Sequence, residues 1–512
     1  MPDNARKIKR RKRRVPASRS ESPKGPAPAY IKREIPFYEF LSEGGLVKLE
    51  EQADWLIQEI GLEFREDPVA LEIWKKAGAD VDGTRVRLPA GAARELCKTA
   101  PSTFTQHARN PARSIEIGGK SQVYAPVFGP PFVRDLEGGR RYATMDDHLR
   151  LTKICHSLDT LHNMGLVICE PCDKPVSKRH LDMLYHMLSY SDKPCLGAIT
   201  EMSRAQDSVD AAKVVFGEEF MREHCVIMGN VNTNSPLLVD RVVTQAAQVY
   251  SGAGQGLIAA PFILSGAMGP VTTAASIAQA LAEAMMICAF TQLIKPGSPF
   301  ILGNFLSSMS LRTGAPTFGT PEPMISNLVI GQLARRLNVP LRCGGSLTSS
   351  KLPDAQAAAE SADSMLTTVL GGANFVIHAA GWLEGGLVSG YEKIVQDADR
   401  LGGYQVMLDG LKLDDNALAR GAYHEVQPSE HFLGCAHTME NYQTAFYEAQ
   451  LSNNEAFEQW EENGSKNTTQ AAYERWNKLL DEYERPSMDD ATHDALVDFV
   501  ERRKTELPDA WY

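Results

Sequence analysis

Amide, imidazole and aromatic side chains recur at the ends of short apolar segments in this sequence. His378 lies near the end of NFVIHAAG (374–381), and Asn304 lies near the end of PFILGNF (299–305). When such segments form parallel strands, the side chains at their carboxyl ends meet in one pocket. Amide, aromatic and thioether groups outnumber charged groups there, which favours a small cationic or zwitterionic ligand. We therefore predict that His378 and Asn304 are catalytic.

The candidate binding residues share this position near the end of an apolar segment. Aromatic faces attract cations, whereas amide and charged side chains would hold the polar part of a ligand. The predicted substrate-binding residues are Tyr124, Phe128, Asn230, Asn232, Phe262, Phe305, Arg312, Trp382 and Glu384. The stretch at the end of VPLRCGG (339–345) supplies the predicted cofactor contacts, which are Gly344, Ser346, Thr348 and Ser349.

Each of these features also has a plain structural explanation. His378 could be a hydrogen-bonded core histidine, the amides at 230–234 could form a bonded loop, and single aromatic residues often belong to a core. Cys169 and Cys172 form a CxxC pair, which is typical of a zinc half-site or a redox pair. The sequence has no second CxxC and no H-x-H pair, so we predict no metal site.

Eight apolar segments separated by helical stretches would position these side chains. They span 123–128, 161–169, 194–200, 225–232, 256–262, 299–305, 339–345 and 374–381. This alternation favours βαβ units and a parallel sheet, and eight strands close a (β/α)₈ TIM barrel. We predict this α/β fold, with an open doubly wound sheet as the alternative. A nucleotide-binding version of the alternative is weakened because no G-x-G-x-x-G or G-x-x-x-x-G-K-[ST] motif stands in the required context.

The chain divides into four predicted parts. Residues 1–29 form a basic tail rich in Ser and Pro, 30–119 a helical region, 120–404 the barrel and 405–512 a helical extension. The tail has too few apolar residues to offset the entropy of ordering it. It is either a solvated, disordered tail or an arm that touches an acidic partner or nucleic acid.

Composition limits the remaining possibilities. The chain has 512 residues, of which 43% are hydrophobic, and a net charge of −11, which argues against nucleic acid as the main partner. Nine cysteines without framework spacing indicate reduced thiols and a cytoplasmic protein. No uninterrupted apolar span of about 20 residues is present, so we predict no membrane association. A homo-oligomer is expected.

Several longer segments resemble the trimethylamine methyltransferase family of corrinoid-linked enzymes, over roughly residues 35–450. The segments are VYAPVFGPPFVRDLEGGRRYAT, GAMGPVTTAASIAQALAEAM, SPFILGNFLSSMSLRTGAPTFGTPEP, GGSLTSSKLPDAQAAAES, HAAGWLEGGLVSGYEKIV and HFLGCAHTMENYQTAFYEA. The resemblance implies a (β/α)₈ barrel that passes a methyl group from an amine to Co(I) on a separate corrinoid (cobalamin) protein.

One departure from the family bears on the substrate. Founding trimethylamine enzymes carry pyrrolysine near the segment from Cys343 to Lys351, where every residue here is an ordinary amino acid. The chain therefore resembles the pyrrolysine-free branch, associated with quaternary amines such as glycine betaine. A quaternary ammonium leaves as a neutral tertiary amine without prior protonation. Alternatives are trimethylamine as substrate, a non-catalytic betaine-binding barrel, or a metal-dependent barrel enzyme.

The resemblance also places the corrinoid on a partner protein. The base-off motif D-x-H-x-x-G begins at Asp146 and His148, but Leu151 replaces its glycine. Capping of a helix by Thr144 or Asp146 is the plainer explanation of that stretch. We therefore expect a corrinoid protein to dock over the carboxyl ends of the strands.

Overall fold

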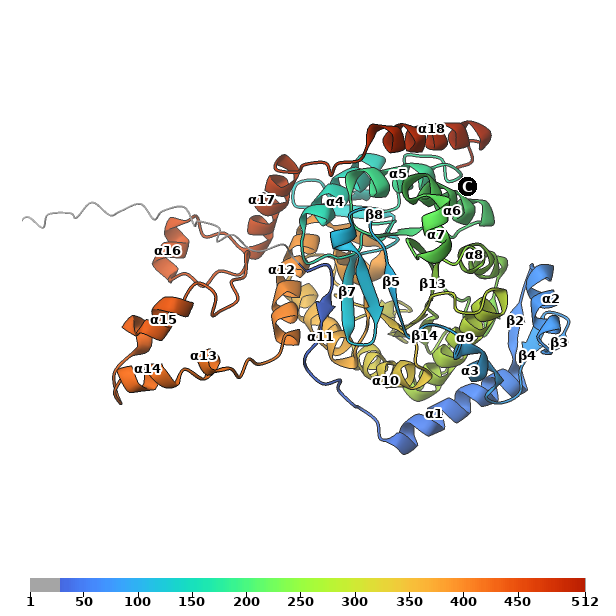
Figure 1. Cartoon of the computed structure of the whole chain (residues 1–512), viewed down its shortest axis with the longest axis horizontal. Coiled ribbons are helices and arrows are strands. Elements are labelled where there is room, and N and C mark those ends of the chain that lie inside the picture. Colours follow the sequence, from blue (N-terminus) through green and yellow to red (C-terminus); the bar gives the residue numbers. More distant parts are fainter. Residues whose placement is uncertain (1–27, 512) are drawn as a thin grey trace, which may run out of the picture.

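A parallel sheet surrounded by helices forms the centre of the structure, a computed structural model that describes residues 28–511 (Figure 1). The predicted basic tail therefore lies almost entirely outside the described residues. The parallel strands follow the order β10, β11, β13, β15, β18, β19 and β7. Their bounds are Cys195–Gly197, Ile227–Val231, Gly256–Ala259, Phe300–Gly303, Leu341–Gly344, Phe375–Ala380 and Ser121–Pro126, respectively. Seven of the eight predicted apolar segments thus overlap a strand of this sheet.

The segment 161–169 forms no regular strand, contrary to the prediction. Asn163 Oδ1 accepts a hydrogen bond from Gly165 N (2.8 Å), and Gly165 has a φ of 63°, so the chain turns where a strand would continue. The backbone still contacts both neighbours. His162 N donates to Tyr124 O of β7 (2.8 Å), and Leu196 N of β10 donates to Gly165 O (2.9 Å).

Helices follow the strands and cover the outer face of the sheet. They are α4 (Met145–Ser157), α5 (Arg179–Tyr190), α6 (Met202–Phe216), α7 (Glu218–Glu223), α8 (Arg241–Gly252), α9 (Thr273–Ile294), α10 (Pro321–Leu337), α11 (Ala355–Gly371) and α12 (Tyr391–Leu408). Within residues 28–511, α9 alone is long and apolar enough to cross a membrane, yet 89% of its most apolar window is buried inside the protein. It packs against α1, α3, α8 and α10, as a core helix does.

The N-terminal region combines helices and strands, whereas the sequence indicated mainly helix. It contains β1 (Ile31–Lys32), α1 (Glu43–Trp55), η1 (Leu56–Ile60), β2 (Leu62–Phe64), α2 (Pro68–Lys76), β3 (Asp80–Asp82), β4 (Arg85–Arg87), α3 (Ala92–Cys97), β5 (Thr103–Gln106), η2 (Pro111–Arg113) and β6 (Ile115–Gly118). Burial explains the short strands. Phe64 of β2 packs against Trp74 and Phe290 at ring-centroid distances of 5.4 and 6.0 Å, so tertiary contacts outweigh local helix propensity.

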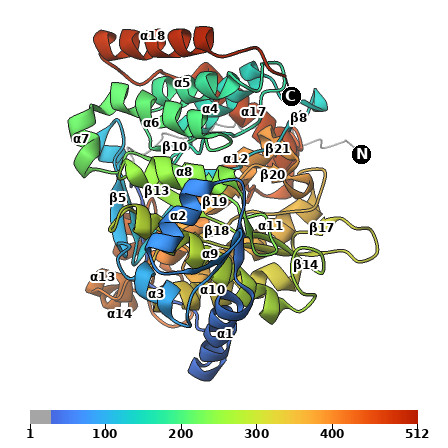
Figure 2. The same ribbon diagram turned by 90° about the vertical axis from the view of Figure 1, so that its right-hand side faces the viewer.

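Short strands at the carboxyl end of the sheet form its rim. They are β8 (Phe132–Asp135), β9 (Gly139–Tyr142), β12 (Leu238–Val239), β14 (Phe262–Ser265), β16 (Phe305–Met309), β17 (Pro316–Thr317), β20 (Trp382–Leu383) and β21 (Val388–Gly390), with η3 (Glu384–Gly386) between the last two. Several lie together on the right in Figure 2. Of these, β14, β16 and β20 directly follow β13, β15 and β19, and they carry the candidate residues Phe262, Phe305 and Trp382.

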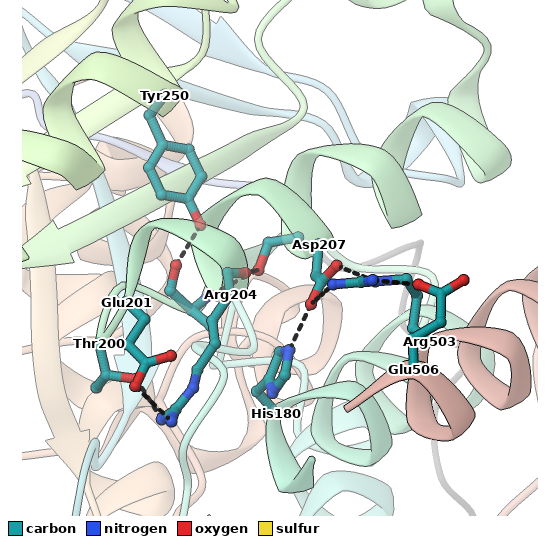
Figure 3. A network of polar contacts seen from close by, with 10 residues as sticks. His180, Thr200, Glu201, Arg204, Asp207, Tyr250, Arg503 and Glu506 are labelled. Carbon is teal, nitrogen blue, oxygen red and sulfur yellow. Dashed lines mark hydrogen bonds and ion pairs between the residues drawn. The ribbon is translucent and has the colours of Figure 1, made fainter. Parts of the chain in front are cut away.

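The C-terminal region begins inside α12, which crosses the expected boundary at residue 404. After it come α13 (Asp415–Leu418), α14 (Arg420–Glu425), η4 (Phe432–Gly434), α15 (Ala436–Asn441), α16 (Phe457–Glu462), α17 (Thr468–Asp481) and α18 (Asp490–Glu506). Figure 3 shows how α18 is held. Asp207 of α6 contacts His180 Nε2 of α5 (2.9 Å) and Arg503 Nε of α18 (2.7 Å).

Acid is expected to destabilise this fold through buried neutral histidines. Burial lowers the pKa of His148 and that of His162 from 6.5 to about 3. Below pH 6.5 the unfolded chain binds protons that the folded chain excludes, so stability falls as the pH drops from 6.5 toward 3. The loss is about 2 kcal/mol for each histidine by about pH 5. Urea unfolding at pH 7.5 and 5 measures it. A double variant, His148→Gln with His162→Gln, should flatten the dependence, and an unchanged slope would contradict this account.

Candidate active site

Aromatic side chains gather around His378 beyond the carboxyl ends of β13, β15 and β19. The His378 ring lies 4.4 Å from Trp382 and 5.4 Å from Phe305, between centroids. Phe262 lies 4.9 Å from Phe305. The structure thus brings together four of the predicted site residues.

Local structure fixes these aromatic side chains in place. Phe262 and Phe305 are paired partners of the parallel strands β14 and β16. Trp382 donates from Nε1 to Thr348 O (3.1 Å) and packs edge-on against Phe318 (5.2 Å). Sequence reasoning missed Phe318, because it follows β17 and lies outside the eight apolar segments.

Arg342 of β18 is the second residue that sequence reasoning missed. Its side chain is 1% exposed, and it forms no ion pair with any residue in 28–511. Its two terminal nitrogens contact Asn304 O (3.1 Å) and His378 Nε2 (3.1 Å), whereas Nε is buried without a partner. The guanidinium carbon lies 4.9 Å from the Phe305 ring centroid. A buried cation without a carboxylate is costly, so this site favours an anionic ligand group. A charged residue inside the apolar VPLRCGG was the signal that could have revealed it.

The hydrogen bonds of His378 point to the same conclusion. Its Nδ1 accepts from Phe128 N (3.2 Å), so in a neutral imidazole the proton lies on Nε2. Burial, and then the Arg342 cation, lower the pKa of His378 well below its usual range, so the ring is neutral. The Nε2–H group of His378 therefore faces an N–H group of Arg342, so two hydrogen-bond donors lie together without an acceptor. An oxyanion between them could accept a hydrogen bond from both. His378 also has a φ of 60°, a strained conformation of the kind found at functional sites.

The two candidate amides have different surroundings. Asn304 Nδ2 donates to Asn327 Oδ1 (2.9 Å), and Asn304 Oδ1 accepts from Ser326 (3.1 Å), so the side chain faces α10. Its contribution to the site is the carbonyl that holds Arg342. Asn230 is buried at the end of β11, and its Oδ1 has no partner. That oxygen is available to a ligand.

The side chains of the predicted cofactor contacts form hydrogen bonds to residues around the aromatic cluster. Ser346 Oγ donates to Ala379 O (2.7 Å), and Ser346 N donates to His378 O (2.8 Å). Thr348 Oγ1 donates to Glu360 (2.5 Å), and Ser349 Oγ accepts from Phe318 N (2.9 Å). Gly344 is the last residue of β18. All three hydroxyl groups are thus engaged in hydrogen bonds within the protein.

Four predicted residues do not join the cluster. Tyr124 is buried on β7 and donates to Gln122 Oε1 (3.0 Å); its burial and its proximity to Tyr404 of α12 raise its pKa. Alternate side chains of a strand face opposite sides, and this one faces a helix. The others are Asn232 and Arg312, which are exposed, and Glu384, which pairs with Arg140 at 2.9 Å.

The CxxC pair and the stretch at 144–148 form hydrogen bonds within the protein. Cys172 Sγ contacts Pro131 O and Glu170 O, and no group of three potential metal ligands occurs within residues 28–511. Thr144 caps α4 by accepting from Asp147 N (3.2 Å), and His148 contacts Leu166 O (2.8 Å). The stretch at 144–148 thus begins a helix.

Comparisons with known proteins identify relatives of this chain. The sequence matches the family described as trimethylamine methyltransferase (MTTB) over residues 6–508. It is 34% identical to the glycine betaine methyltransferase of Desulfitobacterium hafniense, with 92% of this chain and 98% of that protein covered. It is 28% identical to the proline betaine:corrinoid methyltransferase of Eubacterium limosum, with 72% and 77% covered. The fold resembles that of the hydroxylamine MtmB complex, with a TM-score of 0.53 at 10% identity, over 88% of this chain and 90% of that one.

Proposed function

Because this chain belongs to the trimethylamine methyltransferase family, whose named relatives are enzymes, we propose that it demethylates a quaternary amine that carries a carboxylate. Glycine betaine or a close analogue fits this description. The methyl group would pass to Co(I) of a corrinoid carried by a partner protein in the cytoplasm. Trimethylamine is the alternative substrate, and betaine binding without catalysis is the alternative activity.

The observation that carries this proposal is the buried donor pair of Arg342 and His378. Arg342 has no acidic partner in the described chain, and both residues direct N–H groups toward one another. A carboxylate would neutralise the guanidinium and accept from both donors, through short charge-assisted hydrogen bonds. Choline and trimethylamine carry no carboxylate and would leave the cation unpaired.

The aromatic residues would bind the ammonium group of the substrate. Phe305 packs against both Arg342 and His378, Trp382 packs against His378, and Phe262 packs against Phe305. Cation–π attraction contributes about 0.5–2 kcal/mol for each ring. They exclude water without competing chemically for the methyl group. The zwitterion would therefore lie with its carboxylate on Arg342 and its ammonium among the rings.

The chain's contribution to the reaction is positioning rather than acid–base chemistry. When docked at the strand ends, a partner's reduced corrinoid would supply the nucleophile, and the substrate would leave as a neutral tertiary amine. No proton has to move, which agrees with a neutral His378. Fixing the carboxylate holds the reacting N–CH₃ bond in one orientation, and orientation of this kind accounts for much of a displacement rate.

We extend the proposal to the fold. Residues 161–169 bridge β7 and β10 by backbone hydrogen bonds on both sides. We propose that this segment occupies the second strand position of a closed (β/α)₈ barrel. Closure at this point would keep the carboxyl ends of all eight positions around one site.

A methyl-transfer assay with the full chain tests the function. Chemically reduced cobalamin is mixed with glycine betaine, proline betaine, carnitine, choline or trimethylamine, and methyl-cobalamin formation is followed by absorbance. Transfer from a carboxylated quaternary amine supports the proposal. Equal rates with choline would contradict the role of the carboxylate. Calorimetric binding of a betaine without any transfer, even when a reduced corrinoid protein is supplied, would favour the binding protein.

A further inference from the structure

Glu360 of α11 contacts two loops that lie next to the aromatic cluster. Its Oε2 accepts hydrogen bonds from Thr348 Oγ1 (2.5 Å) and from Ser349 N (2.8 Å), both in the loop after β18. Its side chain also packs on Gly319, just after β17, where an added Cβ would lie only 2.6 Å from Glu360 Cβ. One half-buried side chain of a helix thus meets both loops.

The residues that bind Glu360 also hold two aromatic residues of the cluster. Thr348 O accepts a hydrogen bond from Trp382 Nε1 (3.1 Å). Ser349 Oγ accepts one from the backbone N of Phe318 (2.9 Å). The rings of Phe318 and Trp382 pack edge-on at 5.2 Å between centroids. The connection from Glu360 to either aromatic residue therefore passes through a single intervening residue.

The loop after β18 depends on Glu360 for its backbone hydrogen bonds. Residues 345–354 form neither helix nor strand, so their N–H groups need other partners. Ser349 N donates directly to Glu360. Ser350 N donates to Thr348 Oγ1 (2.9 Å), and that hydroxyl group donates in turn to Glu360. Without the carboxylate, two consecutive N–H groups would lose their acceptor or the group that orients it.

We propose that Glu360 is a positioning residue, which fixes Trp382 and Phe318 in the arrangement that receives the ammonium group of the substrate. A ring attracts a cation only when the cation lies within about 6 Å of its centroid. Movement of the loop should therefore weaken binding of the ammonium group more than binding of the carboxylate at Arg342. The inference rests on the proposed function, because a cationic substrate is what the ring geometry would serve.

Calorimetry with two ligands of the same shape tests this role in the full chain. Glycine betaine carries an ammonium group, whereas 3,3-dimethylbutanoate has an uncharged carbon at that position. In Glu360→Ala, the Kd for glycine betaine should rise about 10-fold, and the Kd for 3,3-dimethylbutanoate should rise about 3-fold or less. Equal increases for the two ligands, or an unchanged Kd for glycine betaine, would overturn the proposal.

Two further variants separate the hydrogen bonds from other effects of the substitution. Both loop donors use the same oxygen of Glu360, so Glu360→Gln keeps an acceptor for them and should bind glycine betaine nearly as the wild type does. Gln356→Ala is the matched control, because Gln356 Nε2 donates to the other carboxylate oxygen (2.9 Å) on the same helix. It should leave both Kd values unchanged. A glutamine variant as weak as the alanine variant would overturn the proposal.

Quenching of Trp382 fluorescence by acrylamide provides a readout without ligand. Trp382 is one of six tryptophans and is 3% exposed. Its own signal is the difference between a chain and the same chain with Trp382→Phe. The quenching constant of this signal should rise about 2-fold or more in Glu360→Ala, because the indole would reach solvent more often. A wild-type constant would overturn the proposal. If the wild type binds neither ligand, the proposed function fails, and this comparison still decides the role of Glu360.

The alanine variant is expected to fold, because Asp354 Oδ1 still accepts from Ser350 Oγ (2.9 Å) and holds the loop at the start of α11. If it does not fold, Thr348→Val replaces it in the quenching experiment. That change removes the hydroxyl donor to Glu360 and keeps the carbonyl that binds Trp382. The quenching constant of Trp382 should again rise. A wild-type constant in the folded valine variant would overturn the proposal.

Discussion

Replacing Arg342 with methionine is expected to lower kcat/KM for glycine betaine by about 10²-fold or more. The variant loses one of the two donors to the carboxylate, a charge-assisted hydrogen bond that contributes about 1.5–3 kcal/mol, together with the cation that would neutralise the carboxylate. Methionine fills a similar volume and removes a buried cation that has no acidic partner in the described chain. The free energy of unfolding should change little while activity falls, because the lost hydrogen bond to Asn304 O offsets the relief from burying an unpaired cation. Steady-state kinetics and urea unfolding measure both effects.

Arg33 provides the matched control for that substitution. Its side chain is also buried, but it donates to Val369 O and Pro36 O, both at 2.9 Å, close to β1. Arg33→Met should lower stability, because buried carbonyl groups lose their donors, and leave KM unchanged. Arg342→Lys keeps the charge and should restore part of the activity. If Arg342→Met retains full kcat/KM, the carboxylate does not bind there.

The change His378→Ala is expected to reduce methyl transfer from glycine betaine by about 10²-fold. It removes one of the two donors to the carboxylate and a ring packed between Phe305 and Trp382. Because burial lowers the pKa of His378 well below its usual range, the wild-type rate should show no titration of this ring near pH 6.5. His378→Gln retains an N–H donor and should be less impaired than His378→Ala.

His162 controls for the loss of a buried histidine as such. Its Nδ1 accepts from Tyr124 N (3.0 Å), the same type of bond that His378 makes with Phe128. His162→Ala should therefore destabilise the fold without changing KM. Equal effects of the two alanine variants on kcat/KM would assign His378 a structural role. A wild-type rate that titrates near pH 6.5 through His378 would contradict its neutral state.

The fold could be predicted from sequence where strands are both apolar and regular. Seven apolar segments became parallel strands because burial on both faces selects continuous apolar runs. The segment 161–169 has the same composition, but the side chain of Asn163 bonds to Gly165 N and turns the chain. Competition from a single side-chain hydrogen bond is invisible to a hydrophobic pattern. The strands of the N-terminal region depend on distant partners such as Phe290 and were missed for that reason.

The sequence predicted those site residues that directly follow a predicted strand. Phe262, Phe305, His378 and Trp382 follow strands and meet in space. Arg312 also follows a strand, but the connection between β16 and β17 projects into solvent. Arg342 escaped notice because a charge inside a strand contradicts the apolar pattern used to find the strand. Arg342, the residue that says most about the ligand, therefore lies in a strand whose apolar pattern it interrupts.

The attachment of α18 has a consequence for biosynthesis. Arg503 joins Asp207 across 296 residues of sequence, and Leu496, Phe499 and Val500 of the same helix are buried. At about 5–20 residues per second, a ribosome completes α18 roughly 15–60 s after α6. During this interval the outer faces of α5 and α6 are uncovered on the nascent chain. Those faces are accessible to chaperones for most of translation, and this part of the surface is completed only at the end of synthesis.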